Sequence, residues 1–283
     1  MIPKIIHQTW KTNEIPKEWL PFVRKVKELN PGWQYKLWTD SDNDEFVKNE
    51  YPEFYNIFKG FSRGIMRADV IRYLIMYKIG GVYLDLDYEV LQPFDFGDNT
   101  LVLPLNRSVK YGDKQDELGN CFFASVPGLQ FFKDVISDLK HRPPVVTDHS
   151  QIIEATGPGL LTRIYYERTY PDIYLPDRLI YHPPSPKNKR DISRIKNNGI
   201  SLGIHHIWGS WRDRWTLTSM KIKVKNRIKN LFLFGIIILS MLSCNKDDEP
   251  KVMDQIVVGV KTEHGIFSDF DPVVIERRFG GSR

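Results

Sequence analysis

One stretch decides the fold that we expect for this chain: Gly80-Gly81-Val82-Tyr83-Leu84-Asp85-Leu86-Asp87. A glycine pair that can end a helix precedes a short apolar strand, and two aspartates one residue apart follow it. Because residues i and i+2 of a strand point to the same side, Asp85 and Asp87 can direct both carboxylates at one point. Such oxygen ligands suit a hard cation, Mg²⁺ or Mn²⁺, whose shell is commonly completed by phosphate oxygens.

The Asp-x-Asp pair by itself has two interpretations. It can be a solvated turn in which both aspartates cap the next segment. It can also hold a divalent cation that stabilises the negative charge developing on a departing nucleoside diphosphate. The apolar strand before the pair favours the cation, and the stretch therefore predicts a site for a nucleotide sugar.

A helix is expected immediately before this stretch, from about Ser62 to Ile79, with Gly80 closing it in the left-handed conformation. Asp69 and Arg72 are three residues apart and therefore share one face of this helix. Their spacing fits a surface ion pair, which would contribute little to stability. It also fits a functional pair, in which Asp69 accepts hydrogen bonds from sugar hydroxyls and Arg72 donates to the sugar or the phosphate.

Aromatic side chains follow two further expected strands. Lys4 to Thr9 is a β-rich run that ends at Trp10, whose ring can stack on a base and so contribute about 1–3 kcal/mol; a Trp in the hydrophobic core is the alternative. His205 and His206 follow the short strand Leu202 to Ile204. An imidazole ligand would favour Mn²⁺ over Mg²⁺, which prefers oxygen; histidines that bind no metal are the alternative.

Three stretches of the chain resemble a known family. Arg67-Ala68-Asp69-x-x-Arg72 with the stretch quoted above resembles the Asp-x-Asp sugar-binding region of glycosyltransferase family 32, which is similar to the glucosyltransferase domain of clostridial toxins. Residues 3–10 look like the family's opening strand, and His205-His206-Ile207-Trp208-Gly209-Ser210-Trp211 looks like its closing motif. The stretches occur in the expected order and span residues 3–211.

The resemblance implies an α/β, GT-A-like (Rossmann-like nucleotide-sugar-binding) single domain with a mixed central sheet, and retaining transfer with Mn²⁺ or Mg²⁺. The implied metal ligands are Asp85, Asp87 and His206, although the sequence leaves open which of His205 and His206 faces the site. The implied catalytic residues are Asp69, Arg72, Asp85 and Asp87. The implied donor-binding residues are His7, Gln8, Trp10, Arg67, Asp69, Arg72, Tyr83, Ser210 and Trp211.

The expected reaction moves a hexosyl unit from a GDP- or UDP-linked sugar to a glycan or lipid-linked acceptor, in bacterial capsule or polysaccharide synthesis. Two other classes stay open. A phosphohydrolase of the haloacid dehalogenase type also places Asp-x-Asp after an apolar strand, but Tyr88-Glu89 replaces the small residues expected after the pair. A non-catalytic surface lipoprotein is favoured by the C-terminal segment alone.

The composition is that of a globular α/β enzyme, with 41% hydrophobic and 13% aromatic residues in 283. Two cysteines, Cys121 and Cys244, give no disulfide framework and fit a cytoplasmic location; no signal peptide is expected, because Met1 leads directly into a strand. Residues 221–229 hold five basic and no acidic residues, which accounts for the net charge of +5. The balanced remainder argues against nucleic acid as a partner.

We expect a GT-A-like glycosyltransferase domain over residues 1–218. Residues 219–244 combine the basic run with an apolar run, 231–242, that is shorter than the about 20 residues of a membrane span. Such a segment fits peripheral contact with the inner face of the membrane. Because it ends at Cys244, it also resembles a bacterial lipoprotein signal, which would make it a fusion. We expect residues 245–283 to be poorly ordered.

Overall fold

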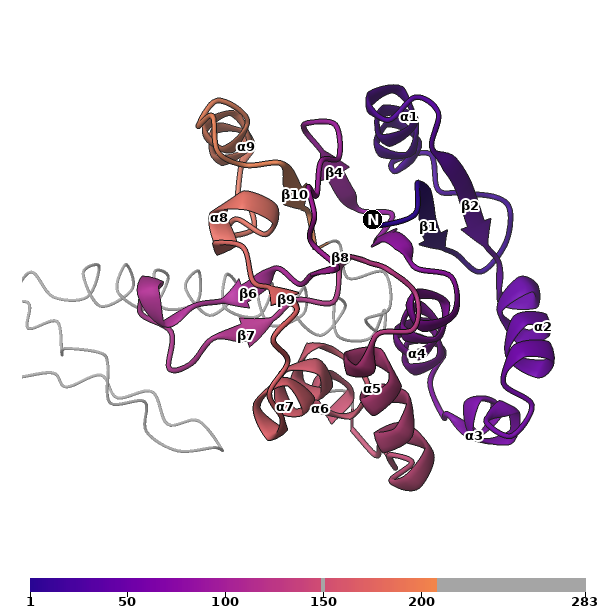
Figure 1. Ribbon diagram of the computed structural model, residues 1–283. Coiled ribbons are helices and arrows are strands. Elements are labelled where there is room, and N and C mark those ends of the chain that lie inside the picture. The colour runs from indigo at the N-terminus through magenta and orange to yellow at the C-terminus, as the bar shows by residue number, and fades with distance from the viewer. Residues whose placement is uncertain (149–150, 208–283) are drawn as a thin grey trace, which may run out of the picture. The chain divides into compact units, whose positions relative to one another are not determined.

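The computed structural model describes residues 1–148 and 151–207 (Figure 1). The expected segments 219–244 and 245–283 lie outside the described residues, as do Ser210 and Trp211. Among the residues described, no helix combines the length and the apolar character that crossing a membrane requires.

The central sheet has six strands in the order β2-β1-β3-β8-β5-β9. Their bounds are Ile5–Thr9 (β1), Gln34–Trp38 (β2), Gly81–Leu84 (β3), Leu101–Val102 (β5), Phe122–Ser125 (β8) and Ile173–Tyr174 (β9). Of these six, β8 runs antiparallel to both of its neighbours and the other five point the same way. The expected α/β fold with a mixed central sheet is therefore confirmed.

Two small antiparallel sheets accompany the central one: β4 (Tyr88–Val90) pairs with β10 (Gly203–His205), and β6 (Leu105–Arg107) pairs with β7 (Glu117–Leu118). The described helices include α1 (Leu20–Leu29), α2 (Asp40–Glu50), α3 (Tyr55–Gly60), α4 (Gly64–Lys78) and α5 (Gln130–His141). They continue with α6 (Ile152–Ala155), α7 (Pro158–Glu167), α8 (Arg178–Tyr181), α9 (Lys189–Lys196) and one turn of 3₁₀-helix at Val109–Tyr111.

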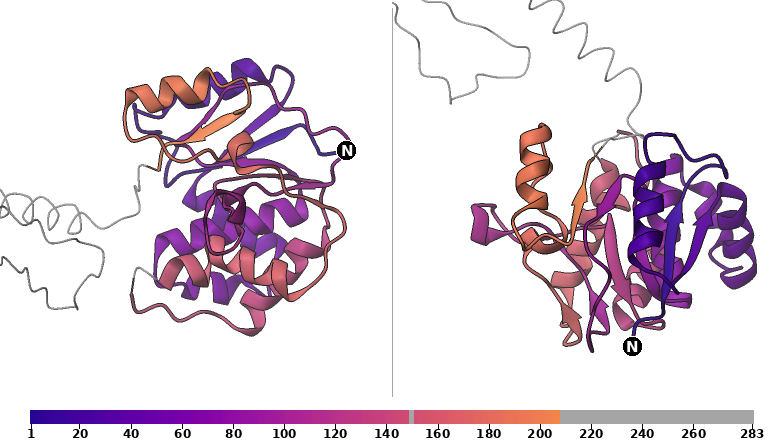
Figure 2. Two further views of the ribbon diagram at one scale, coloured as in Figure 1. Left: turned by 90° about the vertical axis from the view of Figure 1, so that its left-hand side faces the viewer. Right: turned by 90° about the horizontal axis from the view of Figure 1, so that it is seen from above.

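The sheet separates two hydrophobic cores. Tyr83 of β3 lies in the core that α4, α5 and α7 form with one face, whereas Val82 and Leu84 lie in the core beneath α1, β4 and α8. Figures 1 and 2 show α4 to α7 on one side of the strands and α1, α9 and β10 on the other. Because both faces are covered, β3 is buried at all four positions rather than at alternate ones.

Helix α4 occupies Gly64–Lys78, close to the expected 62–79. Gly80 and Gly81 follow with φ of +71° and +99°, which confirms the left-handed ending predicted for Gly80. This tight reversal makes α4 and β3 run in opposite directions. The N-terminal part of α4 and the carboxyl end of β3 therefore lie toward the same edge of the sheet.

Several segments of the chain meet at that edge of the sheet. The carboxyl ends of β1 and β3 lie there because the two strands are parallel neighbours. The antiparallel β8 begins there, so the residues before Phe122 meet the residues after Leu84. The backbone amide of Asp85 accordingly donates to the carbonyl of Cys121 at 2.9 Å. Ligands of open α/β sheets bind beyond the carboxyl ends of strands, so this edge is where a site is expected.

Replacing Gly81 by alanine should destabilise the protein more than replacing Gly97. Both have positive φ, which costs an L-residue about 1–2 kcal/mol. A Cβ on Gly81 would lie 2.5 Å from the carbonyl oxygen of Ile5, whereas a Cβ on Gly97 would meet nothing within 4 Å. Urea denaturation should show a further loss of at least about 1 kcal/mol for Gly81→Ala. Equal losses in the two variants would contradict this close approach of β1.

Candidate functional site

A buried arginine joins α4 to the turn that follows β3. The side chain of Arg72 is 4% exposed, and its Nη2 lies 3.1 Å from Oδ1 of Asp69. Its Nη1 lies 3.3 Å from Oδ1 of Asp85 and donates to the carbonyl of Asn120 at 2.5 Å. Its Nε donates to the carbonyl of Ala68 at 3.1 Å. One guanidinium group thus holds together α4, the turn after β3 and the start of β8.

Asp69 is enclosed on the helix side of this network. Its Oδ1 also accepts from Nδ2 of Asn120, and its Oδ2 accepts from the hydroxyl of Thr156, both at 3.0 Å. Burial raises the pKa of Asp69 to about 6, although the charge of Arg72 opposes the rise. The pair is therefore not the weak surface ion pair that its spacing also permits. Both oxygens of Asp69 are engaged, so its contact with a donor sugar stays a prediction.

Asp85 is fixed from several directions. The hydroxyl of Tyr83 donates to its Oδ1 at 2.9 Å, and the hydroxyl of Thr9 lies 3.2 Å from that of Tyr83. Nε2 of Gln8 donates to the backbone carbonyl of Asp85 at 3.2 Å. The end of β1 therefore holds both the side chain and the backbone of this residue in place.

Asp85, Asp87 and His205 form a group of candidate metal ligands. Their ligand atoms lie within 4.8 Å of one another, and Nε2 of His205 is 3.3 Å from Oδ1 of Asp87 and 3.8 Å from Oδ2 of Asp85. The side chains of the two aspartates are 25% and 14% exposed, so a cation can reach them. Burial raises the pKa of Asp85; Arg72 opposes the rise and Asp87 adds to it. Two carboxylates and an imidazole fit Mn²⁺.

Asp85 and Asp87 lie in the turn that follows β3. The strand position expected from their spacing is therefore wrong. β3 ends at Leu84, and the amide of Tyr88 donates to the carbonyl of Asp85 at 3.0 Å. β4 then begins at Tyr88 and pairs with β10, in which His205 lies opposite Tyr88. This pairing brings the imidazole to the turn.

His205, and not the predicted His206, faces the two aspartates. Nε2 of His206 lies 3.2 Å from Oε2 of Glu89, and its ring stacks on Phe22 with centroids 4.8 Å apart. The physical reason is that neighbouring side chains of an extended chain point to opposite sides. Burial alone would raise the pKa of Glu89, yet hydrogen bonds from His206 and Lys196 lower it to about 2. Of the two histidines, His205 is therefore the one placed beside both aspartates, and binding of a metal by any of these residues stays a prediction.

His7 and Gln8, which are predicted to bind the donor sugar nucleotide, form hydrogen bonds between β1 and neighbouring segments. Nε2 of His7 lies 3.0 Å from the carbonyl of Gly80, and its Nδ1 accepts from Nε1 of Trp38 at 3.0 Å. Burial lowers the pKa of His7 to about 4, so its ring is neutral near pH 7. Oε1 of Gln8 accepts from the hydroxyl of Tyr35 at 2.9 Å. Contact of either residue with a donor stays a prediction.

Trp10 and Arg67 are half-buried. The ring of Trp10 packs edge-on against Trp19 with centroids 4.8 Å apart, and Nη1 of Arg67 donates to the carbonyl of Phe61 at 2.7 Å. Trp10 follows β1 and so lies toward the edge that carries the aspartates. The position of Trp10 is compatible with stacking on a base, and a donor role for either residue stays a prediction.

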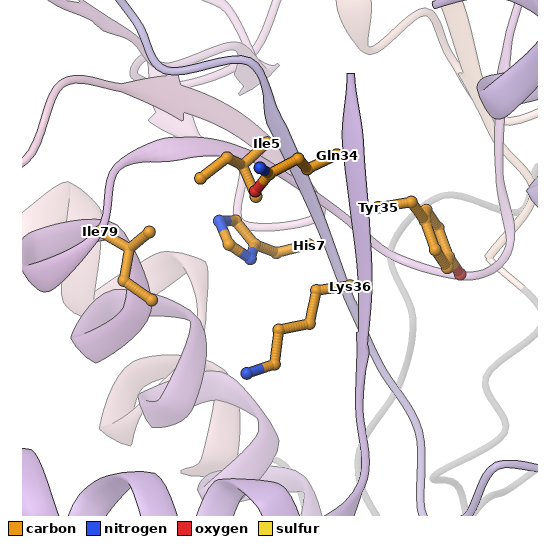
Figure 3. Close-up of a pocket in the computed structure, with 6 residues that line it drawn as sticks. All are labelled: Ile5, His7, Gln34, Tyr35, Lys36 and Ile79. Atoms are coloured by element: carbon orange, nitrogen blue, oxygen red, sulfur yellow. The ribbon is translucent and has the colours of Figure 1, made fainter. Parts of the chain in front are cut away.

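A surface hollow of about 530 Å³ lies at the other end of β1, toward the end of α4 (Figure 3). It does not contain the aspartates, which follow the carboxyl end of β3. Figure 3 shows that Tyr35 and Lys36 extend to opposite sides of β2. The hollow is lined by Ile5, His7, Gln34, Tyr35, Lys36 and Ile79.

Sequence reasoning missed two residues around this site. Thr156 binds Asp69, and the one local signal for it is that it directly precedes Gly157-Pro158-Gly159, a run that favours a sharp bend. His182 lies with Nε2 3.3 Å from Nδ1 of His205 and belongs to no motif. Both contacts join segments that are distant along the chain, so spacing does not reveal them.

Comparison with known proteins matches the part of the chain that contains Asp69, Arg72, Asp85 and Asp87. Residues 16–104 match the family described as "Glycosyltransferase sugar-binding region containing DXD motif". The chain is 39% identical over 168 residues to mannosyl phosphorylinositol ceramide synthase CSH1 of Saccharomyces cerevisiae, covering 58% of this chain and 43% of that protein. It is 29% identical over 143 residues to the initiation-specific alpha-1,6-mannosyltransferase of the same yeast, covering 45% and 30%.

A further relative is inositol phosphoceramide mannosyltransferase 3 of Schizosaccharomyces pombe, 52% identical over 86 residues, which covers 30% of this chain and 24% of that protein. The chain thus spans less than half of the length of each of these three relatives. Among solved structures, the PaToxG glycosyltransferase aligns with a TM-score of 0.45 and 15% identity, over 59% of this chain and 69% of that one.

Replacing Arg72 by methionine should destabilise the protein by about 3–5 kcal/mol, because the buried carboxylate of Asp69 and the half-buried carboxylate of Asp85 then lose their counter-charge. Arg163→Met is the matched control. Arg163 is 40% exposed and lies 2.7 Å from Asp138, which keeps Arg142 as a second cationic partner, so its replacement should cost about 1 kcal/mol or less. Urea denaturation measures both losses. Similar losses in the two variants would contradict the importance of the Arg72 network.

Proposed function

We propose that the whole protein is a metal-dependent, retaining glycosyltransferase, because residues 16–104 match a glycosyltransferase sugar-binding region containing a DXD motif. It moves a hexosyl unit from a nucleotide sugar to a lipid-linked or glycan acceptor. The observation that carries this proposal is the convergence of Asp85, Asp87 and His205 at one edge of the sheet.

The side chains around the aspartates support a cation at this place. Arg72 and Tyr83 engage Oδ1 of Asp85, while Oδ2 is the oxygen 3.8 Å from His205. One carboxylate oxygen is thereby held and the other is left toward Asp87. Mn²⁺ or Mg²⁺ bound there would act as a Lewis acid on the diphosphate leaving group.

The rest of the donor is assigned from the order of the strands. Trp10 and Asp87 follow the parallel neighbours β1 and β3, so a nucleotide sugar lying along this edge can contact both. We infer that the nucleobase stacks on Trp10 and that the diphosphate lies at the aspartates. Arg72, held by Asp69, fixes the carboxylate of Asp85 and lies near the sugar.

The names of the relatives support a sugar and an acceptor class. All three relatives are named for transfer of mannose, and two are named for inositol-containing phosphoceramide. We therefore infer mannosyl transfer to a lipid-linked acceptor as the first reaction to test. The role in bacterial capsule or polysaccharide synthesis, the cytoplasmic location and membrane contact through residues 219–244 stay predictions.

The two alternative functions have weaker support. A haloacid dehalogenase-like enzyme would use Asp85 as its nucleophile, yet Oδ1 of that residue is engaged by Arg72 and Tyr83. The surface-lipoprotein interpretation rests on residues 219–244, which lie outside the described residues.

Replacing Asp87 by asparagine should lower Mn²⁺-dependent release of nucleoside diphosphate from a GDP- or UDP-sugar at least about 10²-fold, because the cation loses a charged ligand. Asp98→Asn, at an exposed loop position, is the matched control and should keep wild-type activity. Circular dichroism should show both variants folded. Wild-type release by Asp87→Asn, or turnover of simple phosphate esters by the wild-type protein, would count against the proposal.

A further inference from the structure

A second group of ligand-type side chains lies on the other side of His205. The ligand atoms of Cys121, His182 and His205 lie within 4.8 Å of one another. Cys121 is 3% exposed and His182 is 4% exposed. They come from three distant segments, since Cys121 precedes β8, His182 follows α8 and His205 ends β10. Cys121 and His182 play no part in the function proposed above, whereas His205 is shared with the group of Asp85 and Asp87.

We propose that Cys121, His182 and His205 bind a zinc ion through the thiolate sulfur, Nε2 of His182 and Nδ1 of His205. The donor set is the first reason. Thiolate and imidazole ligands suit Zn²⁺, whereas the neighbouring carboxylates suit Mg²⁺ or Mn²⁺. Cys121, His182 and His205, which we call the inner site, therefore select a different metal from Asp85 and Asp87, which hold the outer cation. A water molecule can take the fourth position at the zinc ion.

The geometry is the second reason. With zinc–nitrogen bonds of about 2.0–2.1 Å, two imidazole nitrogens of a tetrahedral site lie roughly 3.3 Å apart. Nε2 of His182 and Nδ1 of His205 are 3.3 Å apart, and the two rings are nearly edge-to-face with centroids 5.4 Å apart. The sulfur of Cys121 lies within 4.8 Å of a ring nitrogen of each histidine.

Hydrogen bonds among Cys121, His182 and His205 do not use all of their ligand atoms. Nε2 of His182 and Nδ1 of His205 face each other at 3.3 Å, and a single proton between them lets only one of the two nitrogens donate to the other. A bound cation uses the lone pairs of both imidazoles and of the sulfur, which a single shared proton cannot do.

His205 then connects the two metal sites through its two ring nitrogens. With zinc on Nδ1, Nε2 carries a proton and donates to Oδ1 of Asp87, which lies 3.3 Å away. A histidine ligand that donates its other N–H to a carboxylate is a common arrangement around zinc. In this state His205 orients Asp87 instead of binding the second cation, so that the three-residue set proposed above is reduced to the carboxylates of Asp85 and Asp87.

The test uses the full chain with cobalt as a spectroscopic probe, because Co²⁺ bound to a thiolate gives a sulfur-to-cobalt charge-transfer band. The decisive protein is Cys244→Ser, in which Cys121 is the remaining cysteine. We expect this protein to retain zinc through dialysis and to show the band after exchange with Co²⁺. His182→Gln should bind zinc at least about tenfold more weakly.

Two outcomes separate this proposal from the glycosyltransferase assignment. If Cys244→Ser binds no zinc and shows no charge-transfer band, the inner site is wrong whatever the transfer activity. If Asp87→Asn loses transfer but keeps the zinc and the band, the inner site is supported independently of the outer cation. A band that survives in Cys121→Ser would also overturn the proposal.

Discussion

The ion pairs of the Arg72 guanidinium are the interaction on which this site depends. A charge buried to this degree is tolerated only when it is paired and hydrogen-bonded, because the loss of hydration costs several kcal/mol. Here Asp69 and Asp85 supply the counter-charges, and the carbonyls of Ala68 and Asn120 accept further hydrogen bonds. These partners belong to α4, the turn after β3 and the segment before β8. The arginine therefore fixes both the fold at this edge and the orientation of the Asp85 carboxylate.

The direction of the strands explains why chemistry gathers at one edge. β1 and β3 are parallel and end there, which brings Thr9, Tyr83 and Asp85 into hydrogen-bonding distance. β8 is antiparallel and begins there, which adds Asn120 and Cys121. The separate pairing of β4 with β10 then places His205 beside the two aspartates. His205 stands between an oxygen-rich group and a sulfur- and nitrogen-containing group, so one imidazole links two sites of different metal preference.

The local parts of this arrangement can be predicted from sequence. Apolar spacing and glycine locate α4 and its left-handed ending at Gly80. The spacing of Asp85 and Asp87 indicates carboxylates that converge, but the strand geometry behind that expectation is wrong, because both residues lie in the turn after β3. The non-local parts cannot be predicted in this way. The choice of His205 over His206 depends on the register of β10 against β4. Burial of the Asp69–Arg72 pair depends on the packing of α4 beneath the sheet, since the same spacing serves surface and buried pairs.

The central claim is that Asp85 and Asp87 hold a divalent cation against the diphosphate of the donor. Anomalous diffraction from crystals of the full chain grown with Mn²⁺ and a nucleoside diphosphate tests it most directly. We predict a manganese peak in contact with the carboxylate oxygens of Asp85 or Asp87 and with phosphate oxygens. A bound diphosphate with no manganese beside these carboxylates, or with manganese held elsewhere, would contradict the claim.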